Sequence, residues 1–131
     1  MTRAIKLSEH QEQSVFVKWC RVNGIATASV PNGFFVPTKN QRDRNRLQGQ
    51  IAKLKKEGYA PGFPDLMVFI EGKLLLIEMK VKEGGVVSDN QKKWHGILKD
   101  AGFPVFIAHG ADMAIEHTMK YFYPGEVSNE F

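Results

Sequence analysis

Cysteine is nearly absent from this 131-residue chain, which contains only Cys20. A lone cysteine excludes a disulfide within the chain and is typical of a reducing compartment, so we expect a cytoplasmic protein. The four histidines show no metal-ligand spacing, and without a second cysteine a structural zinc site is not expected. Long apolar runs are also missing, which argues against a membrane span or a signal peptide.

Two classes of catalytic motif are missing as well. Gly84-Gly85 lacks the continuation of a phosphate-binding P-loop, and nothing indicates a Ser-His-Asp or Cys-His nucleophile system. Hydrophobic residues make up 43% of the chain, enough for one core at this length. We expect one domain over residues 8–123, between a flexible leader over 1–7 and an acidic tail over 124–131.

Positive charge is present but unevenly distributed. The net charge is only +4, yet the segment from Lys39 to Lys56 contains a single acid, Asp43, among seven basic residues. Such a segment suits a polyanion, which makes it a candidate nucleic-acid-binding surface, although a solvated helix face is the alternative. The seven are Lys39, Arg42, Arg44, Arg46, Lys53, Lys55 and Lys56.

The first predicted helix has clear ends. Ser8 and Gln11 have the spacing of a capping box, so the helix is expected to begin near Glu9 and to end at Gly24. Helical spacing gives it a buried stripe of Val15, Phe16, Trp19 and Cys20.

The other elements follow from apolar spacing and from glycine and proline positions. Two short apolar runs form a hairpin in the middle of the chain, and the second, continuously apolar, is expected to be a central strand. The predicted order is therefore α-β-α-β-β-α-β-α, an α/β fold with a mixed central sheet flanked by helices. The remaining strands are expected over 25–30 and 104–109, a loop over 34–42, and helices over 43–57, 89–100 and 111–122.

The hairpin carries the strongest functional signal. A two-residue connection, Glu71-Gly72, predicts a tight turn in which Ile70 pairs with Lys73. Counting back from that pair puts Asp65 directly opposite Glu78. Like charges at opposed strand positions destabilise a sheet, so the two carboxylates need an explanation.

A divalent cation between the two carboxylates is that explanation, and oxygen ligands favour Mg²⁺ or Mn²⁺. Strand alternation puts Lys80 on the same face as Glu78, where it would orient or deprotonate a water molecule or stabilise phosphoryl charge. Simpler interpretations exist for each residue. Asp65 fits a turn, Glu78 fits a salt bridge with Lys80 or Lys82, and Lys80 fits a strand end at the surface.

Several motifs follow one another along the chain: Glu-His-Gln-Glu-Gln at 9–13, Pro31-Asn32-Gly33, Gly62-Phe63-Pro64-Asp65-Leu66, Glu78-Met79-Lys80, and Ser88 with Gln91 and Trp94. In this order they resemble the VRR-NUC family (virus-type replication-repair nucleases) of the PD-(D/E)XK nuclease superfamily. The resemblance covers nearly the whole chain, from about Ser8 to Tyr123, and implies the restriction-endonuclease-like core of that superfamily.

The resemblance implies roles for individual residues. Asp65 and Glu78 match the metal-binding carboxylates, and Lys80 matches the motif lysine. The main-chain carbonyl of Met79 is an expected extra metal ligand. Gln91 matches the polar residue that helps to complete the catalytic site, although it also fits as the far partner of a capping box.

A glutamate on the first helix is a further metal ligand implied by the resemblance. Glu9 and Glu12 both qualify, and Glu12 is favoured because it lies on roughly the same side as Phe16 and so points inward. The alternative for Glu12 is a first-turn acid that stabilises the helix dipole.

The expected function is a DNA endonuclease that depends on Mg²⁺ or Mn²⁺ and prefers branched, flap or Holliday-junction-like DNA. A homodimer is expected from the stand-alone phage-type members of the family, with Phe34, Phe35 and Val36 as one candidate face. Two alternatives remain. One is a non-catalytic DNA-binding module, and the other is a sequence-specific restriction-type endonuclease, for which this chain is short.

Overall fold

The computed structural model describes residues 5–30 and 38–125, so the candidate dimer face at Phe34–Val36 lies outside the described residues. The expected order α-β-α-β-β-α-β-α is confirmed. In the described part, no helix is long and apolar enough to span a bilayer. The elements are α1 (Glu9–Val22), β1 (Ala26–Ser29), α2 (Gln41–Lys56), β2 (Leu66–Ile70), β3 (Lys73–Lys80), α3 (Asp89–Asp100), β4 (Val105–His109) and α4 (Ala111–Phe122).

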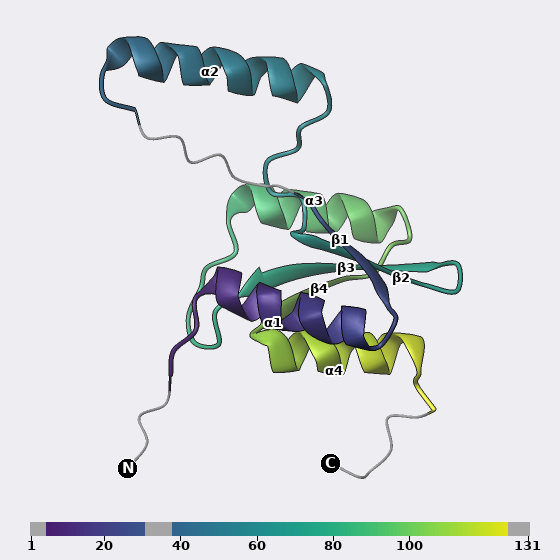
Figure 1. Ribbon diagram of the computed structural model, residues 1–131. Helices are drawn as coiled ribbons and strands as arrows, with labels where there is room; N and C mark the ends of the chain where they lie inside the picture. Colours follow the sequence, from purple (N-terminus) through teal and green to yellow (C-terminus); the bar gives the residue numbers. More distant parts are fainter. Residues whose placement is uncertain (1–4, 31–37, 126–131) are drawn as a thin grey trace.

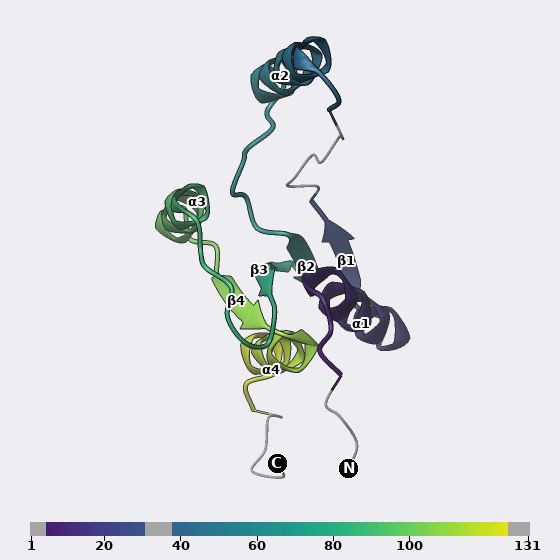
Figure 2. The same cartoon turned by 90° about the vertical axis from the view of Figure 1, so that its left-hand side faces the viewer.

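The sheet is mixed, with strand order β1-β2-β3-β4. β1 and β3 both pair antiparallel with β2, and β4 lies parallel to β3. Helix α3 covers one face of the sheet, and α1 and α4 cover the other (Figures 1 and 2). Residues 75–80 of β3 are all buried, which confirms the prediction of a central strand.

The predicted hairpin register is confirmed. Ile70 pairs with Lys73, and the ladder runs back to Leu66 opposite Ile77. Positive φ angles at both turn residues, 47° at Glu71 and 78° at Gly72, match the turn type that two-residue hairpins favour. Since β2 begins one residue after Asp65, the turn alone brings Asp65 level with Glu78.

Helix α1 begins and ends as predicted, but its buried stripe is shifted. Glu12, Phe16 and Cys20 are buried, whereas Val15 is 46% exposed, so the prediction for Val15 was wrong. The buried residues recur every four positions, and Val15 lies about 100° around the helix from Phe16. The stripe therefore includes a carboxylate in place of an apolar residue.

Helix α2 begins at Gln41, two residues earlier than predicted, so the predicted loop does not extend to residue 42. Asn40 explains the earlier start, because its side chain accepts a hydrogen bond of 2.9 Å from Asp43 N and caps the helix. No residue of α2 is buried. Both ribbon views show it standing apart from the sheet (Figures 1 and 2).

Candidate metal centre

Asp65 is held at the end of the sheet by main-chain contacts on both sides. Its Oδ2 accepts a hydrogen bond of 2.8 Å from Met79 N, and its carbonyl oxygen accepts one of 2.8 Å from Val30 N. The side chain is thereby fixed against β3 next to Glu78. The first turns of α1 and α3 lie at this same end of the sheet (Figure 1).

Glu78 is a buried carboxylate without hydrogen-bond partners among the described residues. It is fully buried, and neither carboxylate oxygen has a hydrogen-bond partner within that part of the chain. Burial, as the main cause, and the neighbouring Asp65 carboxylate, as the next, together raise the pKa of Glu78 from 4.5 to about 10. Two adjacent carboxylates, one of them with both oxygens unpartnered among the described residues, are a donor set that fits a divalent cation, which would stabilise the ionised form of both.

Glu9 belongs to the same electrostatic cluster, although its side chain is exposed at the start of α1. Its pKa is raised by partial desolvation and by the charge of Asp65, while Lys80 lowers it. A hollow of about 420 Å³ opens beside the Glu9 and Asp65 side chains. It is lined by Glu9, Pro61, Gly62, Asp65, Ser88, Asn90 and Gln91.

No group of three His, Cys, Asp or Glu side chains in residues 5–30 and 38–125 is arranged to hold a metal by itself. Mg²⁺ is usually bound through one or two carboxylates, and it keeps several waters and takes substrate phosphate oxygens as further ligands.

Glu12 has a different partner from the one expected. It is 2% exposed, and its Oε2 accepts a hydrogen bond of 2.7 Å from Ala111 N at the start of α4. The N-cap residue of α4 is Gly110, which has no side chain to supply this bond. Glu12 therefore caps α4 from another helix, and the structure favours Glu9 over Glu12 as the acid nearest Asp65.

Lys80 and Gln91 contact each other directly. Lys80 is 7% exposed, and its Nζ donates a hydrogen bond of 3.1 Å to Gln91 Oε1. The same oxygen accepts from Ser88 N at 2.9 Å as part of the capping box of α3. Gln91 therefore caps the helix and contacts the lysine at once. Its place in the capping box is confirmed, and its catalytic role stays a prediction.

Gly62 brings the segment before β2 against the start of α3. A Cβ atom at this position would lie 2.3 Å from the main-chain carbon of Asn90 and 2.6 Å from Gln91 N. The φ angle of Gly62 is also +91°, in the region that favours glycine. This close approach is what places Asp65, three residues later, beside the helix that carries Gln91.

His95 is the site residue that the sequence analysis missed. It is 6% exposed, and its Nε2 lies 3.6 Å from Glu78 Oε1. Its pKa is lowered, first by burial and then by Lys99 and Lys80, which keeps the imidazole neutral at pH 7. Metal-ligand spacing among histidines gave no hint of this role. The sequence did contain a signal that could have placed His95 at the site. His95 follows Gln91 by four residues and so lies on the same helix face as that predicted site residue.

Comparison with known proteins decides the family. A family model described as the VRR-NUC domain matches residues 7–112. The chain belongs to the VRR-NUC family. A solved structure named "VRR_NUC domain protein" has the same fold, with a TM-score of 0.69 and 22% sequence identity over 92% of this chain and 93% of that one. No curated protein matches the chain.

VRR-NUC is a nuclease family, which implies DNA as the substrate of this chain. The match includes Glu9, Asp65, Glu78, Lys80 and Gln91, because all five fall within residues 7–112. These five side chains are therefore part of the VRR-NUC domain.

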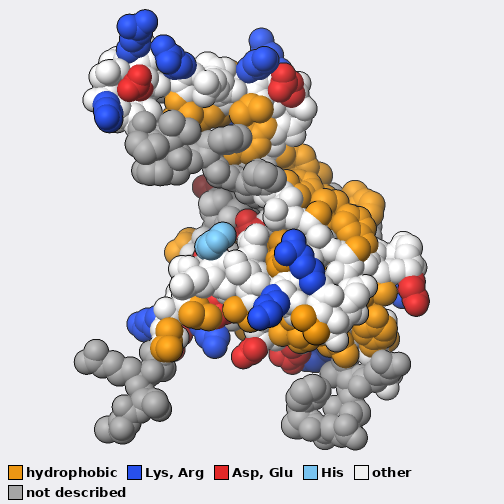
Figure 3. All heavy atoms as spheres, in the orientation of Figure 1, with side chains coloured by type: hydrophobic (Ala, Val, Ile, Leu, Met, Phe, Trp, Pro, Cys, Tyr) orange, Lys and Arg blue, Asp and Glu red, His pale blue; other side chains and the backbone are white. Residues whose placement is uncertain are grey.

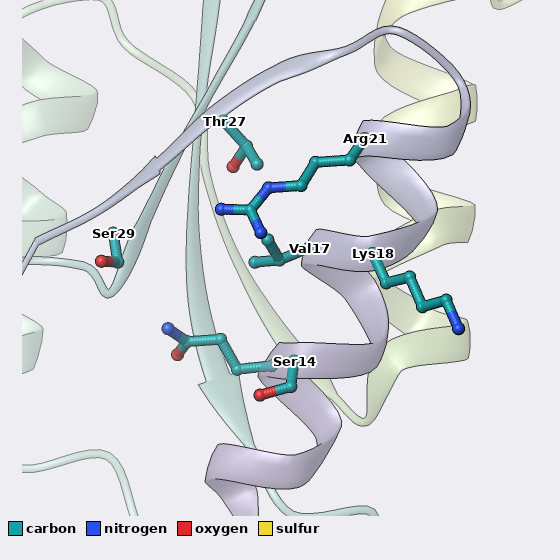
Figure 4. A pocket seen from close by; sticks show the side chains of 7 residues that line it. Ser14, Val17, Lys18, Arg21, Thr27 and Ser29 are labelled. Atoms are coloured by element: carbon teal, nitrogen blue, oxygen red, sulfur yellow. The ribbon is translucent and has the colours of Figure 1, made fainter.

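A second hollow, of about 270 Å³, lies between α1 and β1 (Figure 4). The Arg21 side chain reaches across it toward Thr27, while Lys18 points away (Figure 4). Its lining contains no carboxylate, so it is a poor cation site. The hollow beside Asp65, which is lined by two carboxylates, is the better candidate for a cation site. The residues that line the second hollow are Gln13, Ser14, Val17, Lys18, Arg21, Thr27 and Ser29.

The two glutamates of α1 give a paired prediction. We expect Glu12→Ala to lower the free energy of unfolding by about 1–2 kcal/mol, because it removes a buried helix cap. Glu9→Gln, at an exposed position, is expected to change stability by less than about 0.5 kcal/mol but to slow DNA cleavage. Urea denaturation and single-turnover cleavage measure the two effects. A folded Glu12→Ala protein with slowed cleavage, beside a fully active Glu9→Gln protein, would reverse the assignment.

Proposed function

We propose that this VRR-NUC protein is a divalent-metal-dependent DNA endonuclease that hydrolyses phosphodiester bonds. Asp65, Glu78 and the main-chain carbonyl of Met79 would hold Mg²⁺ or Mn²⁺, with Glu9 as a further contact. The observation that supports this proposal is the buried Glu78 carboxylate, whose two oxygens have no hydrogen-bond partner among the described residues and which lies beside a second carboxylate. A protein that only binds DNA would lose stability from such a pair and gain nothing from it.

When bound, the cation supplies Lewis-acid activation of a water molecule and of the scissile phosphate. The chain supplies the rest of the chemistry. Lys80 has three N–H donors, of which Gln91 engages one at 3.1 Å, so the ammonium is oriented by α3. Its remaining donors would stabilise charge that develops on the phosphate, or orient the attacking water.

Helix α2 supplies the positive charge that a DNA backbone requires. Lysine and arginine side chains gather on its outer face, and hydrophobic side chains lie on the face turned toward the sheet (Figure 3). In the described part, the ion pairs do not involve the basic residues of α2. Phosphate contacts position DNA without reading its sequence, so we propose selectivity for DNA shape, such as branched, flap or Holliday-junction-like substrates.

The salt dependence of DNA binding tests this role of α2. We expect the Arg42→Ala/Arg44→Ala/Arg46→Ala protein to bind DNA more weakly, with the slope of log K against log[salt] reduced by about 2–3, because up to three phosphate contacts are lost. Lys120→Ala, on α4, is the control and should leave the slope unchanged. An unchanged slope in the triple variant would exclude these three arginines as phosphate contacts.

A homodimer is also part of the proposal. Isolated helices of about this length are marginal in water, and no residue of α2 is buried in the described structure. Leu47, Ile51 and Leu54 on its apolar side suit packing against a second copy. Sedimentation velocity at micromolar concentration should give a dimer, and a monomer would overturn this part of the proposal.

Cleavage of a substrate panel tests the function as a whole. The panel contains linear duplex, flap, splayed-arm and four-way-junction DNA, each with Mg²⁺, Mn²⁺ or EDTA. We expect cleavage of the branched substrates with either metal and none with EDTA. Absence of cleavage on every substrate would favour the DNA-binding module. Cleavage confined to one sequence in linear duplex would favour the restriction-type enzyme.

A further inference from the structure

Glu78 and His95 face each other with their polar atoms unsatisfied. In the described residues, the buried side-chain atoms without a hydrogen-bond partner are Glu78 Oε1, Glu78 Oε2 and His95 Nε2. The imidazole nitrogen lies 3.6 Å from the nearer oxygen, beyond the usual limit of a hydrogen bond. The Glu78 carboxylate and the His95 imidazole are therefore two buried groups that each need a hydrogen-bond partner and that lie just beyond hydrogen-bond distance of each other.

The geometry of β3 and α3 explains why these groups meet. Glu78 and Lys80 are two residues apart on a strand, a rise of about 6.6 Å. His95 and Gln91 are four residues apart on a helix, a rise of about 6 Å. Because the two rises nearly match, α3 places one polar side chain against each of the two strand residues, His95 against Glu78 and Gln91 against Lys80.

We propose that His95 is a positioning residue for the Glu78 carboxylate, donating an Nε2–H hydrogen bond to Oε1 while Oε2 binds the divalent cation. This inference rests on the proposed metal site. A metal-bound carboxylate is ionised, and its second oxygen needs a donor in a buried site. An approach of about half an ångström brings the 3.6 Å separation into the hydrogen-bond range.

Direct ligation of the metal by His95 is the competing arrangement. Mg²⁺ and Mn²⁺ prefer oxygen donors, whereas imidazole suits zinc, copper, iron and nickel. Carboxylates that bind metals are commonly held by a hydrogen bond from a neighbouring group. The donor preference of the expected cations therefore favours the positioning role.

Calorimetric titration of Mn²⁺ into the DNA-free protein tests the role. We expect His95→Leu to weaken binding by about 10–100-fold and His95→Gln, whose amide restores a donor near the position of Nε2, to stay close to wild type. Leu98→Ala, on the same helix, is the control and should bind as wild type does. Equal affinity of His95→Leu and wild type would overturn the inference alone. A wild-type protein that binds no Mn²⁺ would overturn the proposed metal site and this inference with it.

Two measurements on the wild-type protein apply even where His95→Leu does not fold. With Mg²⁺ bound, ¹⁵N NMR should show the tautomer of His95 that is protonated on Nε2. With Mn²⁺ bound, electron spin-echo spectra should show no coupling to a directly bound imidazole nitrogen. An unprotonated Nε2, or a strong nitrogen coupling that disappears in His95→Gln, would overturn the positioning role.

Discussion

Asp65→Asn is expected to slow metal-dependent DNA cleavage by at least about 100-fold, because a metal-binding carboxylate supplies several kcal/mol of transition-state stabilisation through its cation. Asparagine is the informative replacement. Its Oδ1 can still accept the hydrogen bond that Met79 N donates to Asp65, so the contact with β3 is kept while the negative charge is lost. Single-turnover cleavage of a branched substrate with Mn²⁺ measures the effect.

Asp112→Asn is the matched control for this experiment. Asp112 is an exposed carboxylate in the first turn of α4, so its replacement should leave the cleavage rate unchanged. Circular dichroism and a melting curve show whether both variants fold. A folded Asp65→Asn protein that cleaves at the wild-type rate would remove Asp65 from the catalytic centre.

Glu78→Gln is expected to make the metal-free protein more stable at alkaline pH. Its folded-state pKa of about 10 lies above the unfolded value of 4.5, so the folded protein keeps a proton that the unfolded chain has lost. Wild-type stability should therefore fall as pH rises from 4.5 toward 10, by up to about 1.4 kcal/mol per pH unit. Glutamine carries no titrating proton, so the variant should lose this part of the pH dependence.

Urea denaturation between pH 7 and 8.5 measures the difference. This window lies above the titration of His95, whose pKa is lowered, and below that of the Cys20 thiol, whose pKa burial raises to about 11. Mg²⁺ should stabilise the wild type more as pH rises, because it binds the ionised carboxylate, and it should leave Glu78→Gln unchanged. Identical pH slopes for the two proteins would show that the Glu78 carboxyl does not hold its proton when folded.

Local sequence signals predicted most of the fold. The capping boxes at Ser8 and Ser88 fixed the starts of two helices, because each cap is formed within four residues. The Glu71-Gly72 turn fixed the hairpin register and therefore brought Asp65 level with Glu78, since a two-residue loop allows one pairing. Both signals are short-range, and a single sequence contains them in full.

The rest of the site depends on contacts that no local pattern contains. Glu12 caps a helix that begins 99 residues later, so its inward position was predictable but its partner was not. The proposed role of His95 depends on its position beside Glu78 on β3. That position depends on how α3 crosses the sheet. Metal-ligand spacing among histidines could not identify His95, because the residue that His95 faces is the carboxylate of Glu78 and not another histidine.

Metal binding to the protein without DNA is the most direct test of a metal centre at Asp65 and Glu78. Mn²⁺ titrated into wild type and into an Asp65→Asn/Glu78→Gln double variant, followed by calorimetry, separates the site from any effect of substrate. We expect saturable binding to wild type and none to the folded double variant over the same concentrations. Equal Mn²⁺ binding by the two proteins would contradict a metal centre at Asp65 and Glu78.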